Sequence, residues 1–306
     1  MAKMKGTAER GGASAGAERL AIKKTYKLFI GGSFPRTEGG KTVPITDAGG
    51  MIVARAARAT RKDLREAVVA ARGALSGWSG RTAFNRGQIL YRLAEMMELR
   101  RAELAAEIGT ARGARVADAD AEVTVAIDRT VWYAGWCDKY AQLFASVNPV
   151  AGPYFDFTVP EPCGVVAIVA PPLPSLLGLV STALPALVSG NTVIAIASDR
   201  DPLSAVAFAE CVATSDLPSG AFNLLTGRRA DLLPHIAKHM DVNAIAAFGV
   251  EADAARALAA EGAESVKRVH AEPPAEPEFW YGAEAQSPYW IERLTEAKTT
   301  WHPIGW

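Results

Sequence analysis

The chain has 306 residues, of which 49% are hydrophobic, and its 33 lysine and arginine residues balance 33 aspartate and glutamate residues. A chain of this length can bury a sizeable core in one large or two modest domains. The balanced charge provides no field that would steer it toward nucleic acid or an anionic membrane, so we expect neither as a partner. Its three cysteines, Cys137, Cys163 and Cys211, lie far apart, which argues against a disulfide framework and fits a reducing cytoplasm.

Residues 1–22 are rich in glycine, alanine and charged residues and show no apolar periodicity. They lack the apolar segment of a secretory signal, so we expect a disordered tail. The uncharged stretch 164–198 is longer than the roughly 20 residues that a membrane span needs. Four prolines interrupt it, so a continuous spanning helix is not expected, and we predict a cytoplasmic protein.

The first part of the chain predicts two short strands and three helical segments. Residues 26–46 are typical of two strands joined by a glycine-rich turn. Apolar residues at helical spacing predict a helix over 61–74 and a longer amphipathic helix over 81–108. The segment 122–144 carries tryptophan and tyrosine along one side, which we interpret as core or subunit-contact packing, because aromatic residues at this spacing most often fill space.

The centre of the chain alternates strands and helices. Residues 150–160 alternate apolar and polar side chains, as a half-buried strand does. The apolar run 165–170 predicts a strand buried on both faces, and 192–197 predicts a second one. Between them, 176–188 predicts a short helix, and Pro202 marks the first turn of the next helix. This alternation is typical of a doubly wound parallel sheet.

The order EPCGVVAIVAPP…LPALVSGNTVIAIASDRDPL over 161–203 resembles the cofactor-binding core of the aldehyde dehydrogenase superfamily. Three later segments extend the resemblance: LPSGAFNLLTG over 217–227, DVNAIAAFG over 241–249 and VKRV over 266–269. The resemblance implies an α/β fold with a Rossmann-like doubly wound parallel sheet and a small antiparallel oligomerisation arm.

The chain then departs from the family. Residues 270–277, HAEPPAEP, replace a Gly-Gly motif with a segment that we expect to be extended and semi-rigid. The closing RLTEAKTTWHPIGW resembles the last strand of the family's oligomerisation arm, so the catalytic domain that should precede it is missing from its place. We therefore predict a tail over 1–22, a Rossmann-like NAD(P)-binding-type domain over 23–146 and 161–269, an oligomerisation arm over 147–160 and 287–306, and a Pro-rich linker over 270–286 in place of the catalytic domain.

The chemical residues of the family are largely absent. Its nucleophile lies in a Gly-Gln-x-Cys motif that this chain lacks. The cysteines of this chain have no histidine or helix N-terminus nearby in sequence, and we expect inert, packed thiols. By the resemblance, Leu173 stands where a side-chain amide would hold the oxyanion, and Leu cannot donate a hydrogen bond. Glu272 stands at the general-base position, where we expect only a solvated charge.

The resemblance leaves four candidate cofactor-binding residues for NAD or NADP: Pro171, Asp199, Gly227 and Gly249. Asp199 aligns with the glutamate that grips the ribose hydroxyls, whereas Ile196 replaces the lysine that reaches the same ribose. Each lost charge-assisted hydrogen bond costs about 1.5–3 kcal/mol, so two or three losses would weaken a micromolar site to millimolar.

For a metal, His235 and His239 lie four residues apart. No third ligand accompanies them in a recognisable motif, and we expect no metal site.

Three functional hypotheses remain open at this point. The first is an aldehyde dehydrogenase-like pseudoenzyme, a structural or regulatory subunit that forms a hetero-oligomer with a full-length aldehyde dehydrogenase. The second is an NAD(P)-dependent aldehyde oxidoreductase of reduced size, and the third is a dinucleotide-binding sensor.

Overall fold

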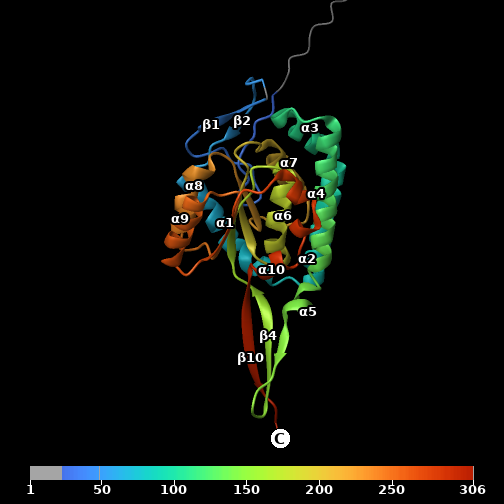
Figure 1. Ribbon diagram of the computed structural model, residues 1–306, viewed down its shortest axis with the longest axis vertical. Helices are drawn as coiled ribbons and strands as arrows, with labels where there is room; N and C mark the ends of the chain where they lie inside the picture. The colour runs from blue at the N-terminus through green and yellow to red at the C-terminus, as the bar shows by residue number, and fades with distance from the viewer. Residues whose placement is uncertain (1–22, 48, 306) are drawn as a thin grey trace, which may run out of the picture.

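A five-stranded parallel sheet forms the centre of the computed structural model, which describes residues 23–47 and 49–305. The strand order is β7-β6-β5-β8-β9, so the chain moves outward from β5 to β7 and then returns to the other side of β5 (Figure 1). The strands are β5 (Val165–Val169), β6 (Thr192–Ile196), β7 (Phe222–Leu225), β8 (Ala244–Phe248) and β9 (Arg268–Glu272). The predicted doubly wound α/β fold is confirmed.

Helices cover both faces of this sheet and give two apolar cores (Figure 1). One face carries α1 (Arg61–Ser79), α8 (Arg229–Lys238) and α9 (Ala252–Ala263). The other face carries α6 (Ser175–Val188) and α7 (Leu203–Thr214), which are covered in turn by α2 (Ala83–Leu99), α3 (Arg101–Arg112) and α4 (Val116–Trp136). Because both faces are covered, β5, β6, β7 and β8 are buried along their whole length, which explains their continuous apolar runs.

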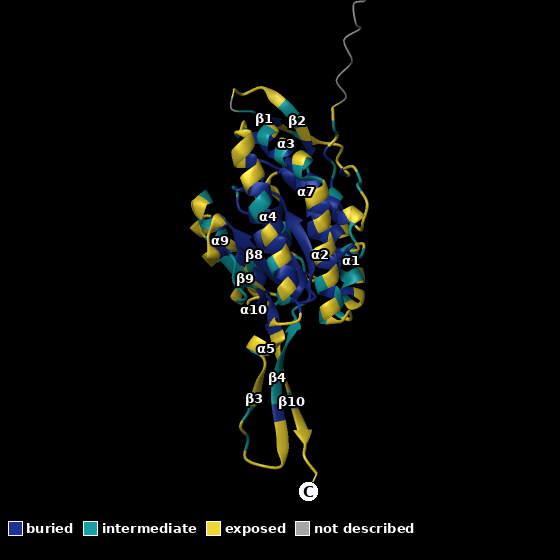
Figure 2. Cartoon of the chain, turned by 90° about the vertical axis from the view of Figure 1, so that its right-hand side faces the viewer, coloured by how far each residue is buried: buried dark blue, intermediate teal, exposed yellow. Residues whose placement is uncertain are grey.

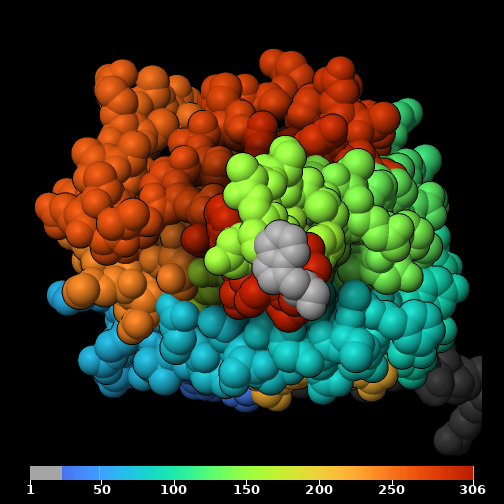
Figure 3. Space-filling model, turned by 90° about the horizontal axis from the view of Figure 1, so that it is seen from below, coloured from blue at the N-terminus to red at the C-terminus, as the bar shows by residue number. Residues whose placement is uncertain are grey.

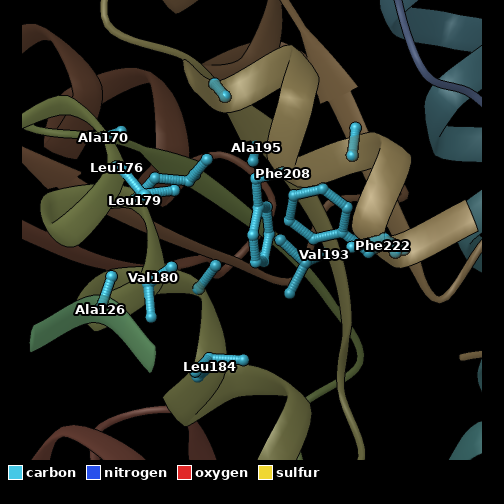
Figure 4. Packing of buried hydrophobic residues seen from close by; sticks show 14 of the residues in the cluster. Ala126, Ala170, Leu176, Leu179, Val180, Leu184, Val193, Ala195, Phe208 and Phe222 are labelled. Atoms are coloured by element: carbon cyan, nitrogen blue, oxygen red, sulfur yellow. The ribbon is translucent and has the colours of Figure 1, made fainter. Parts of the chain in front are cut away.

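Helix α6 is the most deeply buried helix of this second layer, since every one of its residues is buried. Leu179, Val180 and Leu184 lie among side chains of β6 and α4 in Figure 4. Phe208 of α7 meets Phe222 of β7 edge to face, with ring centroids 5.5 Å apart. This packing places the start of α6 firmly beside the end of β5, at the edge where a ligand site is expected.

A three-stranded antiparallel arm extends from the body, as the sequence predicts (Figures 1 and 2). Its central strand β4 (Tyr154–Pro162) pairs with β3 (Ser146–Asn148) and with β10 (Thr295–Pro303), which comes from the far end of the chain. The register sets Asp156 opposite Trp301. Viewed from the tip, the arm stands over the middle of the body (Figure 3).

Two predicted helices are each divided in the structure. The helix expected over 81–108 ends at Leu99, and α3 starts at Arg101, because Arg100 leaves helical geometry (φ −107°, ψ 16°) and turns α3 toward α7. The segment 122–144 forms the end of α4 and the separate short helix α5 (Tyr140–Phe144). Of its aromatic residues, Tyr133 and Tyr140 are buried, and Trp132 and Trp136 pack partly against the same core.

The prediction of a hairpin within 26–46 is also wrong, because its second strand pairs with a later segment of the chain. Strand β1 (Thr42–Thr46) pairs with β2 (Ile52–Ala57), which the sequence analysis missed. Residues 23–41, the described residues before β1, make isolated bridges only, among them Phe29 with Leu224 of β7. The edge strand of the main sheet thus draws Phe29 away from a local hairpin.

The predicted linker over 270–286 has an extended first part and a helical second part. Its first residues complete β9, and two short 3-10 helices follow, η1 (Pro277–Tyr281) and η2 (Ala283–Ala285). Trp280 is buried, and α10 (Tyr289–Glu292) leads directly into β10. Apolar side chains in this segment therefore fold it onto the body.

The predicted tail over 1–22, and the last residue of the predicted arm, lie outside the described residues. Among the helices that the structure describes, none combines the length and apolar character needed to cross a membrane.

Candidate cofactor site at the carboxyl edge of the sheet

The strand order places a topological switch point between β5 and β8. The connections leaving these two neighbouring strands run in opposite directions, and in doubly wound folds ligands bind in the crevice outside the strand ends at such a point. Ala170 and Gly249 are the first residues beyond β5 and β8. The candidate cofactor site of this chain is therefore the crevice between these two strand ends.

All four predicted cofactor residues lie beyond the carboxyl ends of strands of this sheet. Pro171 follows β5 and is buried against α6, where a Cβ at Gly178 would lie 2.3 Å from the Pro171 ring. Gly249 has a φ of 66°, and a Cβ there would lie 2.5 Å from Pro172. Asp199, beyond β6, is exposed and lies in an ion pair with Arg229. The packing of the chain against itself thus explains the presence of proline at 171 and glycine at 249 without a cofactor.

Gly227 lies at the same edge but two strands away from β5, in the turn between β7 and α8. Its φ is 127°, which favours glycine. A Cβ at this position would come within 3.1 Å of the Ala59 amide nitrogen and 3.2 Å of Arg58 Cα. The requirement for glycine here comes from the close approach of the segment that follows β2.

Arg229 occupies the crevice itself, and the sequence analysis did not single it out. Its Nη1 donates to the carbonyl oxygens of Ala170 and Phe248, at 3.0 and 3.1 Å. Its Nη2 donates to Gly249 O at 3.4 Å, and its Nε lies 3.5 Å from Asp199 Oδ1. The side chain is only 15% exposed, and burial lowers its pKa while Asp199 opposes that effect. A guanidinium group thus joins the ends of β5 and β8.

One feature of the sequence could have revealed Arg229. Arg228 and Arg229 follow a predicted strand directly, at the start of a helix, where the helix dipole disfavours positive charge. A cation at such a position needs compensation from elsewhere, and the carbonyl oxygens at the strand ends provide it.

These residues do not fit a dinucleotide in the way the resemblance implies. The carboxylate expected to bind the ribose, Asp199, is paired with Arg229. Ile196, at the position of the missing lysine, is fully buried and offers no donor. We therefore derive no chemical step through a nicotinamide cofactor at this crevice.

The three cysteines are poorly suited to nucleophilic catalysis. Cys137 and Cys211 are buried, Cys163 is half-buried, and burial raises the pKa of each thiol to about 12. The Cys163 thiol donates to Asn191 Oδ1 at 3.4 Å, a structural contact. Thiols with such pKa values hold almost no thiolate near neutral pH.

The positions that the resemblance assigns to the oxyanion donor and the general base are also poorly suited to catalysis. Leu173 lies half-buried in the loop between β5 and α6, where its side chain cannot donate. Glu272, at the end of β9, accepts a hydrogen bond from Arg293 Nη1 at 2.7 Å in an exposed ion pair. Glu272 is thus partly exposed and paired with a surface arginine.

A buried charged cluster lies close to this edge, at the start of α6. Glu122 of α4 accepts hydrogen bonds from the amides of Leu176 and Leu177, at 2.8 and 3.2 Å, and so caps the helix. Arg112 pairs with Glu122 and lies 3.6 Å from Asp201. Burial raises the pKa of Asp201 to about 6. This cluster orders the β5–α6 and β6–α7 connections.

His235 and His239 do not form a metal centre with other residues. His239 ends α8 and accepts a hydrogen bond from the Asp241 amide through Nδ1. Within residues 23–47 and 49–305, no three histidine, cysteine or acidic side chains are grouped closely enough to hold a metal ion.

A hollow of about 610 Å³ lies on the outer surface between α2 and α4, away from the strand ends. Phe84, Tyr91 and Val131 are among its lining residues, and all three are exposed. It lies on the opposite side of α6 from the sheet and does not connect to the candidate cofactor site.

The sheet order, its switch point and the antiparallel arm define a dinucleotide-binding type of α/β domain with an added arm. The sequence profile of the aldehyde dehydrogenase family matches residues 36–278, which is most of the chain. The chain belongs to the aldehyde dehydrogenase family.

Comparison with known proteins supports this assignment, and it also shows that the match covers only part of each relative. Mouse cytosolic 10-formyltetrahydrofolate dehydrogenase is 34% identical over 238 residues, which cover 76% of this chain and 26% of that protein. The D-glyceraldehyde dehydrogenase (NADP(+)) of Thermoplasma acidophilum is 32% identical over 79% of this chain and 49% of its own length. The chain thus spans between about a quarter and a half of the curated relatives it matches.

Solved structures lead to the same conclusion. The crystal structure of PnpE from Pseudomonas sp. WBC-3 has a TM-score of 0.75 and 29% identity, covering 80% of this chain and 50% of PnpE. A structure of PnpE in complex with nicotinamide adenine dinucleotide matches equally well, at 28% identity. The family fold therefore accommodates this cofactor in PnpE.

Proposed function

We propose that this chain is a pseudoenzyme of the aldehyde dehydrogenase family, a non-catalytic subunit that assembles with a full-length aldehyde dehydrogenase. The observation that carries the proposal is one face of the arm. Val147, Phe155 and Phe157 lie on that face, and Val147 and Phe155 are 67% and 44% exposed. The Phe155 and Phe157 rings pack together with centroids 5.5 Å apart.

The opposite face of the arm combines a buried polar contact with exposed aromatic side chains. Asp156 is only 2% exposed there, although the arm is a single sheet. Asn148 Nδ2 donates to Asp156 Oδ1 at 2.6 Å, and Tyr154 packs edge to face on Trp301 at 5.7 Å. Asp156 is enclosed on this face, whereas Tyr154 and Trp301 are 43% and 59% exposed, so the arm presents aromatic side chains on both faces. An exposed apolar patch of this kind is typical of a protein interface.

The edge of the arm offers a second means of contact. Strand β10 is the outer strand of the arm, and within the described residues it pairs with β4 alone. The free backbone groups along such an edge can pair with a strand from another chain. The apolar face and the open edge together support a protein partner.

The connection between β9 and β10 supports a non-catalytic role. Residues 273–294 link the two strands through η1, η2 and α10, so no catalytic domain is inserted at this point. The cysteine thiols carry raised pKa values, and Leu173 offers no donor to an oxyanion. A full-length family member would supply the groups that this chain lacks.

The test is purification of the tagged chain from its own cells under gentle lysis, followed by identification of the bound proteins by mass spectrometry. We expect a full-length aldehyde dehydrogenase to co-purify. Replacing Phe155 and Phe157 together by Ser should reduce its recovery at least tenfold, because central aromatic residues at interfaces contribute about 2 kcal/mol or more each. Tyr91→Ser removes an aromatic residue that is 53% exposed on the body and serves as the control.

Two results would count against this role. One is a purified chain that carries no aldehyde dehydrogenase, and the other is an arm variant that still retains the partner fully. A reduced-size aldehyde oxidoreductase would instead turn over aldehyde with NAD when purified alone. A dinucleotide sensor would bind NAD without turnover.

A further inference from the structure

Arg229 uses its donors on the main chain of its own protein. Both carbonyl oxygens that it joins through Nη1, those of Ala170 and Phe248, lie at the ends of neighbouring parallel strands. Gly249 O accepts from Nη2, and Asp199 lies beside Nε. An open crevice would leave these carbonyl oxygens to a ligand or to water. Here one side chain satisfies them.

Entry of a ligand would require this side chain to leave. Three carbonyl contacts and one ion pair would be broken, and a charged side chain that is 15% exposed would need a new position. Charge-assisted hydrogen bonds of this kind are among the stronger ones in proteins. A ligand would have to replace all of them before it gained any affinity.

We propose that Arg229 closes the switch-point crevice to dinucleotides. Its guanidinium group engages Asp199, the carboxylate that the family resemblance assigns to the ribose hydroxyls, and bridges β5 and β8 where the ligand would lie. The wild-type chain therefore binds NAD and NADP weakly, and removal of the Arg229 side chain opens the crevice. This inference holds whether or not the chain assembles with a partner.

The direction in which the affinity for NAD changes on substitution distinguishes closure by Arg229 from a purely electrostatic effect. NAD carries a negatively charged pyrophosphate, so loss of a nearby arginine should weaken its binding if charge alone mattered. Closure by Arg229 predicts the opposite for this one residue. Arg228 provides the matched control, since it is the preceding residue, carries the same charge and is exposed.

The experiment is titration of NAD into the purified full chain by calorimetry, at one fixed ionic strength, for the wild type, Arg229→Ala and Arg228→Ala. We expect Arg229→Ala to bind at least tenfold more tightly than the wild type, a change of about 1.4 kcal/mol. Arg228→Ala should bind no more tightly than the wild type. Equal affinities for the wild type and Arg229→Ala would overturn the inference, and so would an equal gain in Arg228→Ala.

A measurement on the wild-type protein guards against a variant that does not fold. In the closed crevice the Arg229 guanidinium protons are held by three carbonyl oxygens, and they should exchange slowly with water in ¹⁵N–¹H spectra. Millimolar NAD should leave their resonances unchanged. Rapid exchange, or a saturable shift on addition of NAD, would show an open crevice. Neither result bears on co-purification with a partner, so this inference and the proposed subunit role fail independently.

Discussion

Arg129 of α4 holds the segment that connects the main sheet to the arm, and its removal should destabilise the fold. The residue is 1% exposed. Its Nη1 donates to Ala285 O at 2.6 Å and Ser181 Oγ at 2.7 Å, and its Nη2 donates to Trp280 O at 3.0 Å. Its Nε donates to Gln286 Oε1 at 3.0 Å. One side chain thus fixes η1, η2 and the residue that follows them against α6.

The expected cost of Arg129→Ala follows from the groups left without a donor. The carbonyl oxygens of Ala285 and Trp280 are buried contacts, and each unsatisfied group costs about 1–3 kcal/mol. The loss of the Ser181 contact and of packed side-chain volume adds to this. Removing a buried cation returns part of the cost, because burial disfavours the charge and lowers the Arg129 pKa. We expect a net loss of about 3 kcal/mol in the free energy of unfolding.

Urea unfolding followed by far-UV circular dichroism measures this loss, and limited proteolysis shows whether 277–286 is released. Arg115→Ala is the control, because the Arg115 side chain is 83% exposed and its pairing with Asp118 lies on the surface. The control should leave the midpoint unchanged. If Arg129→Ala unfolds within about 1 kcal/mol of the wild type and resists protease equally, the assigned role of Arg129 is wrong.

Two further predictions concern titratable groups. Burial raises the folded-state pKa of Asp201 from 3.8 to about 6, so folding takes up a proton between these values and the stability contributed by this group falls as pH rises from about 4 to 6. One pKa unit corresponds to about 1.4 kcal/mol, so the free energy of unfolding of Asp201→Asn should rise by at most about 3 kcal/mol relative to that of the wild type between pH 4 and 7.5. A difference in urea midpoint between the two proteins that stays constant over this pH range would contradict the prediction. The three thiols, with pKa values near 12, should react with Ellman's reagent at least about a thousandfold more slowly in the native protein than in urea; rapid modification of Cys163 in the native state would contradict it.

The sequence predicts the central sheet well because its physical constraints are local. Strands β5, β6 and β8 are buried on both faces, so each must be a short run of apolar residues, and each was found as such. The same reasoning missed the break at Arg100. Leu93 and Met97 before the break, and Leu104 and Ile108 after it, all face one core, so the apolar spacing continues where the helix does not.

The contacts of the buried arginines could not be predicted in the same way. Arg129 and Arg229 appear in the sequence as single charges among helical residues. Their acceptors come from distant parts of the chain, from residues 280–286 for Arg129 and from the ends of two strands for Arg229. The aligned positions Asp199 and Gly249 were retained, yet alignment alone does not reveal that the chain's own side chains contact them.

These two arginines have a common consequence for the function of the domain. In each case a buried guanidinium group satisfies main-chain carbonyl oxygens of its own chain. Arg229 does so at the switch point, and Arg129 does so along the short connection after β9. At these two places the chain therefore satisfies its own carbonyl oxygens without a ligand. The bare apolar face around Phe155 and Phe157 does not meet its need for burial, so the arm, and not the crevice, is where we expect this protein to act on another molecule.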